Sequence, residues 1–216
     1  MKKSMTGLLA AAVTTALLGA SSASAYDKGD FIARAGAAGV YPTGESENIA
    51  GLGKVEADSA WSLGLSFTYM ATGNIGVTVL GAWPFEHDIE GSSGALDDLG
   101  KVAKTKHLPP TVTAEYHFDL ANKRLHPFVG AGLNYTYFFD EDTKGALSGT
   151  DIDIDNSWGW ALDAGLDYEL DNNWTIGAQV YYINIETEAK LEAVGNNKYD
   201  VDINPWVFFL NVGRKF

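Results

Sequence analysis

Cysteine is absent from the 216-residue chain, so no disulfide can stabilise its fold. A basic surface is missing as well: the formal net charge is −13, which argues against a nucleic-acid partner, since phosphates require basic residues. No segment after the N-terminus approaches the roughly 20 apolar residues of a spanning helix. An exported chain of this kind needs a large core or a closed barrel, and it can cross a membrane only as strands.

The N-terminus has the layout of a secretory signal peptide. Lys2 and Lys3 form a positive region, residues 8–20 are apolar, and Ala23-Ser24-Ala25 supplies small residues for cleavage. We therefore expect residues 1–25 to be removed, and residues 26–216 to form a single domain. Because no cysteine lies near the cleavage site, a lipid-anchored lipoprotein is not expected.

Hydrophobicity repeats every second residue along the rest of the chain, which indicates β-strands. In AWSLGLSFTYM, the odd positions from Trp61 to Tyr69 are apolar or aromatic, and the even positions are serine, glycine or threonine. The same alternation predicts eight strands, within residues 30–41, 60–70, 75–85, 109–118, 127–139, 157–170, 174–182 and 204–216.

The connections between these strands alternate in length. Residues 71–74, 119–124 and 171–173 are short and turn-like, whereas 43–59, 88–107, 140–156 and 187–200 are long and polar. Short turns at one end and long loops at the other are typical of outer-membrane barrels.

The two faces of the strands distinguish a membrane barrel from a soluble sandwich or lipocalin-like barrel, which also alternates. The polar face is rich in glycine, serine, threonine and alanine, which suit the inside of a narrow barrel better than a surface in water. The apolar face has aromatics at strand ends, as in membrane girdles, and no charge at mid-strand. The sequence thus predicts an all-β, eight-stranded antiparallel transmembrane β-barrel.

The chain ends on an apolar strand that finishes with Phe216. A terminal phenylalanine after alternating apolar residues resembles the signal that the barrel assembly machinery of outer membranes reads. Arg214 departs from this pattern, but so close to the end its long side chain can reach the membrane interface.

Several stretches resemble the outer membrane protein W (OmpW) family, namely FTYMATGNIGV (67–77), HLPPT (107–111), PFVGAGLNYTYFFD (127–140), DNSWGWALDAGLDY (155–168) and PWVFFLNVGRKF at the end. The resemblance runs from about Phe31 to Phe216. It implies a narrow, porin-like outer-membrane barrel that conducts small hydrophobic molecules through an apolar interior and releases them sideways into the bilayer.

Most residues of the predicted inner face are small or polar, but four are large. By parity, the large residues that point inward are Leu80, Phe128, Phe138 and Tyr181. They predict either ordinary filling of the lumen or an apolar pocket with a constriction. In the resemblance, Leu80 and Tyr181 align with the lumenal leucine and the aromatic constriction of the family.

Charges of both signs lie on the inner face toward the periplasmic half, at Arg34, Glu115, Asp163, Asp167, Glu169 and Lys215. Because buried charges should pair, we interpret them as a polar plug that blocks free flow of water and ions; ion conduction is the alternative. Proline weakens strand pairing, and Pro84, Pro109 and Pro110 fall on adjacent third and fourth strands. We predict the lateral exit there.

Other motifs carry no chemistry in our interpretation. DIDIDN at 151–156 suggests calcium, but its sixth and twelfth positions, Asn156 and Leu162, do not fit the loop pattern. We expect it to continue the sixth strand with its aspartates inward. His87 and His107 lie near the outer rim without a nucleophile at a persuasive spacing. We expect no enzyme, no catalytic residue, no cofactor and no metal.

The function that these patterns favour is passive uptake of small hydrophobic molecules. One alternative is a structural or surface-interaction barrel, for example a receptor whose loops bind partners without transport. Another is a soluble periplasmic binding barrel, which the outward aromatic rows disfavour. Expected partners are outer-membrane lipid and lipopolysaccharide, the assembly machinery and small apolar ligands, with a monomer favoured.

Overall fold

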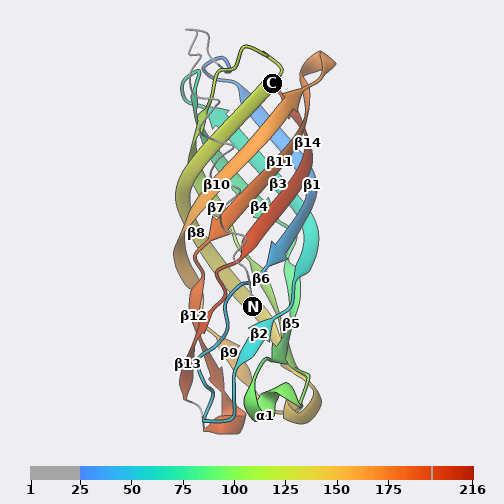
Figure 1. The fold of residues 1–216 in the computed structure, drawn as a ribbon, viewed down its shortest axis with the longest axis vertical. Coiled ribbons are helices and arrows are strands. Elements are labelled where there is room, and N and C mark those ends of the chain that lie inside the picture. The colour runs from blue at the N-terminus through green and yellow to red at the C-terminus, as the bar shows by residue number, and fades with distance from the viewer. Residues whose placement is uncertain (1–24, 196) are drawn as a thin grey trace, which may run out of the picture.

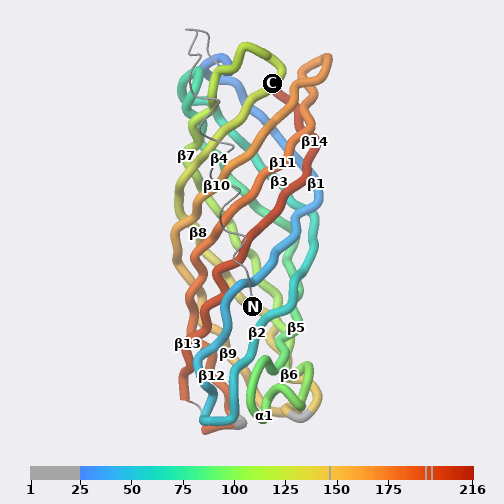
Figure 2. Tube along the Cα trace, viewed as in Figure 1, coloured from blue at the N-terminus to red at the C-terminus, as the bar shows by residue number. Residues whose placement is uncertain are grey.

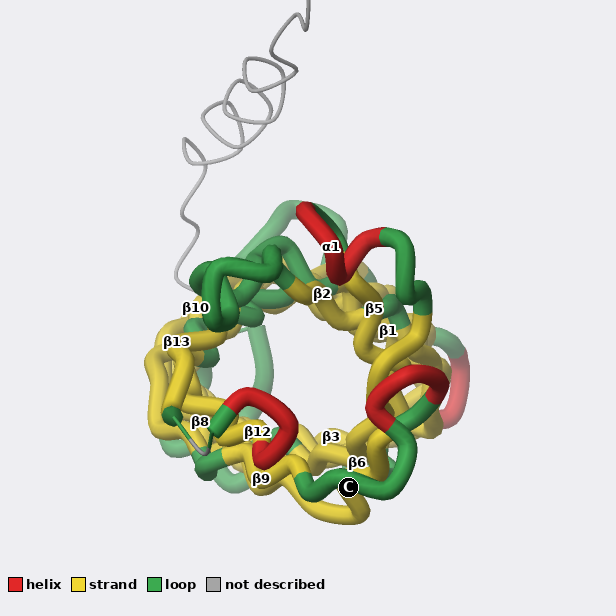
Figure 3. The backbone as a smooth tube through the Cα atoms, turned by 90° about the horizontal axis from the view of Figure 1, so that it is seen from below, coloured by secondary structure: helices red, strands yellow, loops and turns green. Residues whose placement is uncertain are grey.

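The computed structural model describes residues 25–195 and 197–216, and these form a closed antiparallel β-barrel (Figure 1). The expected signal peptide lies outside the described residues except for Ala25. Strand β1 pairs with both β3 and β14, and β8 pairs with both β7 and β10, so the barrel wall closes on itself. Viewed along the barrel, the strands form a ring (Figure 3). The eight barrel strands are β1 (Phe31–Tyr41), β3 (Ala60–Met70), β4 (Ile75–Ala82), β7 (Thr111–His117), β8 (Leu125–Thr143), β10 (Ser157–Glu169), β11 (Trp174–Ile183) and β14 (Trp206–Lys215).

Beyond one end of the barrel the sheet continues as an extension, where the sequence predicted long polar loops. The alternation in these segments is masked by charged residues, so their strands were missed. The extension contains β2 (Val55–Ala57), β5 (Phe85–Gly91), β6 (Lys101–Leu108), β9 (Ile152–Ile154), β12 (Glu186–Leu191), β13 (Lys198–Asp202) and α1 (Gly94–Asp97). Three 3-10 turns complete the described elements, at Gly145–Leu147, Asp171–Asn173 and Glu192–Val194. Since long loops are extracellular in such barrels, this is the extracellular end.

The alternation predicted from the sequence is present in the barrel strands. On β3 the side chains of Trp61, Leu63 and Phe67 are exposed, while Ser66 and Thr68 are buried inside. Outward aromatics gather at the extracellular end (Tyr41, Trp61, Trp83, Tyr137, Trp158, Trp160, Trp206) and at the periplasmic end (Phe31, Tyr69, Tyr116, Trp174, Phe216). An apolar outer belt with two aromatic rows matches the lipid-facing surface of an outer-membrane barrel. Among the described residues, no helix is long and apolar enough to cross a membrane.

Residues 151–156 correct one expectation. Ile152 and Ile154 line the interior of the extension, and Asp151, Asp153 and Asp155 are exposed. The aspartates therefore point outward. The reason is that β9 is separate from β10: it pairs with β12, and the residues between them are not in a strand, which resets the alternation before Trp158.

Candidate functional site

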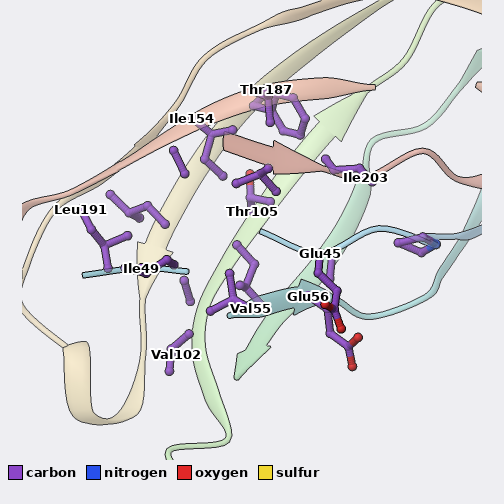
Figure 4. Close-up of a pocket in the computed structure, with 18 of the residues that line it drawn as sticks. Glu45, Ile49, Val55, Glu56, Val102, Thr105, Ile154, Thr187, Leu191 and Ile203 are labelled. Atoms are coloured by element: carbon purple, nitrogen blue, oxygen red, sulfur yellow. The ribbon is translucent and has the colours of Figure 1, made fainter. Parts of the chain in front are cut away.

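An apolar cavity, here called the vestibule, occupies the extracellular extension (Figure 4). It encloses about 850 Å³, part of it open to solvent. Aliphatic side chains from several strands and loops form its wall, including Ile49, Val55, Val102, Ile154, Leu191 and Ile203. Short extension strands bring these residues together because their inner faces are apolar while their outer faces carry the charges. The vestibule can hold an apolar molecule away from water.

An apolar layer closes the lumen below the vestibule. Leu80, Phe138 and Tyr181 pack in one cluster with Phe85 and Phe209, and all are buried. The hydroxyl of Tyr181 donates a hydrogen bond to Gln179 Oε1 at 2.8 Å, so its polar end is satisfied within the wall. Three of the four inward residues predicted from parity are thus brought together.

Phe128, the fourth, lies elsewhere. Its ring is 4.9 Å from the ring of His117 and 5.8 Å from the guanidinium carbon of Arg34, deep in the periplasmic half. The reason is distance along the strand: Phe128 and Phe138 share the inner face of β8, but ten residues span about 34 Å. Phe128 packs against the polar plug and not in the constriction.

The polar plug is built around Arg34 and Asp167, which are fully buried. Arg34 donates from Nε at 3.1 Å and from Nη2 at 2.5 Å to Asp167 Oδ2, and from Nη1 to Thr68 Oγ1 at 2.7 Å. Glu115 and His117 form a second buried contact, with Oε2 and Nε2 3.1 Å apart. Asp163 lies beside Glu115, where Gly130 leaves space for both carboxylates. Asp163 also pairs in register with Tyr181, so the apolar layer meets the plug directly.

Lys215 belongs to a separate group at the periplasmic rim. Its Nζ lies 3.6 Å from Glu169 Oε1 and 5.7 Å from the ring centre of Tyr26. Tyr26 stacks on His126 at 4.5 Å, and His126 contacts Glu169. Neither Tyr26 nor His126 was predicted as a site residue, because Tyr26 precedes the first predicted strand and His126 lies close to a predicted turn.

The strand ladder is interrupted where the prolines stand. The β4–β7 ladder ends at the pair Leu80–Thr111, and the β5–β6 ladder begins at Phe85–His107. Residues 81–84 and 108–110 are therefore unpaired with each other in the described sheet, and we call this stretch the side gap. On the far side of Pro110 the wall stays closed, since Tyr135 N–H donates to Pro110 O at 3.0 Å.

His87 and His107 lie on the inner face of the extension, where both are buried next to the side gap. They line a second cavity together with Pro42, Ala57, Thr105, Phe138, Ile185 and Ile203. Five of these residues also line the vestibule, so the second cavity is its inner end. The signal that places both histidines inside is their parity with Phe85 across the β5–β6 pairing.

Comparison with known proteins gives a consistent family assignment. The profile of the OmpW family matches residues 27–216. Outer membrane protein W of Vibrio cholerae serotype O1 is 43% identical over the whole of both chains, and that of Escherichia coli K12 is 42% identical, covering 96% of this chain and 97% of its own. The crystal structure of OprG from Pseudomonas aeruginosa is similar with a TM-score of 0.80 and 38% identity, covering 88% of this chain and 97% of that one. The chain belongs to the OmpW family, and it is an outer-membrane β-barrel.

Proposed function

We propose that the barrel admits small hydrophobic molecules passively, from the lipopolysaccharide layer into the vestibule and then sideways into the bilayer. The observation that carries this proposal is the position of the side gap. The apolar vestibule ends on a closed layer of Leu80, Phe138 and Tyr181, and the interrupted ladder lies beside that layer.

A straight path through the lumen is unfavourable for an apolar molecule. Below the apolar layer, the lumen is filled by the buried charges of Arg34, Asp167, Glu115 and Asp163. Passing them would require opening charge-assisted hydrogen bonds in a site shielded from water, which is costly. A molecule that leaves through the side gap passes from the apolar vestibule to the apolar bilayer, so its apolar surface is not exposed to water.

The lateral step depends on backbone groups in the side gap. Pro84, Pro109 and Pro110 have no N–H, so they cannot donate across the gap. The exposed ring of Trp83 stands outside it, 74% accessible, at the level of the extracellular aromatic row. This proposal contains no catalytic step and no cofactor.

Uptake of a small apolar dye into intact cells tests the proposal. We expect the wild-type protein to speed uptake, and Leu80→Asp combined with Tyr181→Asp to abolish that gain, because two carboxylates would wet the apolar layer. A matched control is Leu52→Asp combined with Leu99→Asp, two exposed leucines of the extension, which should leave uptake unchanged. Surface levels must be equal in all strains.

The rival function predicts a different pattern. If the protein is a surface-interaction barrel, the lumen variant would behave like the wild type in every assay, while changes in the extension would abolish partner binding. Equal dye uptake with and without the protein would therefore reject transport.

A further inference from the structure

A charged side chain stands among the apolar residues of the outer wall, near the periplasmic end. The outward, exposed positions of β14 are Trp206, Phe208, Leu210, Val212 and Arg214, and Phe216 follows in the same row. Phe216 and Trp174 belong to the periplasmic aromatic row, which marks the level of the lipid headgroups. Arg214 is therefore at headgroup level, on the side of the wall that meets lipid.

Two aromatic rings flank the guanidinium of Arg214. Trp174 lies opposite Arg214 in the register of β11 and β14, and its ring centre is 5.7 Å from the guanidinium carbon. The ring centre of Phe216 is 5.3 Å from the same carbon. Both distances are within the range of cation–π attraction, which restricts the positions that this long side chain adopts. The rings attract the charge, but they leave the N–H groups of the guanidinium free to donate to a ligand.

The guanidinium has no anionic partner in the described part of the chain. Arg34 and Arg124 each pair with an aspartate, whereas Arg214 forms neither an ion pair nor a side-chain hydrogen bond with a described residue. The carboxylate at the C-terminus is included in that statement. On the β1 side its register partner is Ala33, whose methyl group is too small to cover a guanidinium. The donors of Arg214 are therefore open to a ligand from the membrane.

A phosphate group matches this arrangement in charge, geometry and location. The guanidinium is planar, and two of its N–H groups can donate to two oxygens of one phosphate. In an outer membrane the periplasmic leaflet consists of phospholipids, whose phosphates lie at headgroup level. Val212, the next outward residue toward the membrane centre, is exposed, so an acyl chain attached to the phosphate would contact the same wall. A soluble phosphate lacks this second contact, and one exposed ion pair alone is weak.

We propose that Arg214, Trp174 and Phe216 bind the phosphate of a phospholipid in the periplasmic leaflet of the outer membrane. Arg214 donates to the phosphate oxygens, while the rings of Trp174 and Phe216 hold its guanidinium in place. The site is at the opposite end of the barrel from the vestibule, and it does not depend on the proposed uptake function. It gives a role to the arginine that departs from the apolar pattern of the C-terminal strand.

Native mass spectrometry of the folded protein in dodecyl maltoside, a detergent without phosphate, tests the site. Dioleoyl-phosphatidylglycerol and dioleoylglycerol are compared, because they have the same acyl chains and only the first has a phosphate. We expect Arg214→Gln to lower the affinity ratio of the phospholipid to the diacylglycerol about fivefold, the effect of one basic residue beside an anionic lipid. Arg124→Gln is the matched control, since it removes a periplasmic arginine that pairs with Asp171, and it should keep the wild-type ratio.

The same experiment separates a lipid from a free anion. Glycerol 3-phosphate in excess should leave phosphatidylglycerol bound, because it has no acyl chain to contact the wall. Displacement of the lipid by glycerol 3-phosphate would show that Arg214 binds free phosphate, and would reject the lipid site. An equal affinity ratio in the wild type and Arg214→Gln, or an equal fall in Arg124→Gln, overturns the site as well.

Solid-state NMR on the unchanged protein measures the contact directly. With ¹³C at the Cζ atoms of arginine, the chain has three signals to assign, from Arg34, Arg124 and Arg214, and Arg124→Gln identifies the second. In phospholipid bilayers, ³¹P should dephase the Arg214 signal and leave that of Arg34 unchanged, since Arg34 is buried in the polar plug. An Arg214 signal that ³¹P does not dephase contradicts the proposal, because the guanidinium then faces water instead of phosphate.

Discussion

Arg34 is the largest of the fully buried side chains, and it stands at the centre of the polar plug. Its bond to Thr68 joins β1 to the neighbouring β3, and its ion pair with Asp167 joins β1 to β10, which is far away in sequence. Such a buried pair adds little net stability compared with apolar packing, but the loss of one partner leaves the other charge without compensation. Arg34 and Asp167 must therefore be present together, since either one alone would be a buried charge without a partner.

Replacing Arg34 alone should be strongly destabilising. Arg34→Met is expected to lower the free energy of unfolding by about 3–5 kcal/mol, because Asp167 stays buried without its partner. Adding Asp167→Leu should restore most of the loss. Urea unfolding of the protein in lipid vesicles measures both. The control is Arg124→Met, whose pair with Asp171 is exposed and worth about 0–1 kcal/mol. Equal unfolding curves for Arg34→Met and Arg124→Met would contradict this prediction.

At the scale of elements, prolines separate two barrel strands from two strands of the extension. Pro84 lies between β4 and β5, and Pro109 and Pro110 lie between β6 and β7, so the two breaks face each other. Most of β5 and nearly all of β6 lie in the segment that the sequence predicted as a loop. Backbone pairing resumes on both sides of the side gap. The barrel therefore stays closed, although one short stretch lacks ladder hydrogen bonds. The gap is a local property of two neighbouring strands, and the rest of the barrel can remain rigid around it.

Replacing the prolines restores backbone N–H donors and should narrow the side gap. We expect the triple change Pro84→Ala, Pro109→Ala and Pro110→Ala to slow dye uptake, because the new N–H groups can pair across the gap. Pro127→Ala with Pro205→Ala is the matched control, since both residues lie outside the gap. Hydrogen exchange at residues 81–84 and 108–110 reports whether the ladder has formed. A closed ladder with undiminished uptake would remove the lateral exit from the proposal.

At the scale of the whole molecule, the barrel is sealed by its two end strands. Figure 2 shows β1 and β14 side by side. Two backbone hydrogen bonds join the ends of these strands: Phe31 N–H donates to Phe216 O at 3.1 Å, and Phe216 N–H donates to Phe31 O at 2.8 Å. The Phe216 ring points outward, 65% exposed, and the Arg214 guanidinium lies 5.3 Å from it and 5.7 Å from Trp174. The closing bonds use the backbone of Phe216, and its ring takes no part in them.

The sequence predicts that the assembly machinery reads the Phe216 ring, and Phe216→Ala should separate that recognition from barrel closure. The backbone bonds to Phe31 do not depend on the ring, so refolding of the purified variant in detergent should match the wild type. In cells, the fraction that reaches the heat-resistant folded form should fall several-fold. Phe208→Ala, another exposed aromatic of β14, is the comparison and should assemble normally. Loss of refolding in detergent would show that the ring stabilises the barrel itself.

The sequence by itself determined the barrel, its two faces and most of the lumenal residues. Alternation with a period of two decides which side of a strand each residue takes, and closure follows once every strand has an apolar outer face. For this reason Leu80, Phe138 and Tyr181, as well as Arg34 and Asp167, are buried inside as their parity predicts.

Only the tertiary structure decided the heights and partners of these residues. Parity cannot show that Phe128 lies with Arg34, because the level of a residue in the lumen depends on strand stagger and tilt. It also fails wherever a strand breaks, as between Ile154 and Trp158, since one irregular residue reverses the faces. The His87–His107 stack depends on the pairing of two extension strands within residues 85–108, a segment that the sequence had largely assigned to a loop.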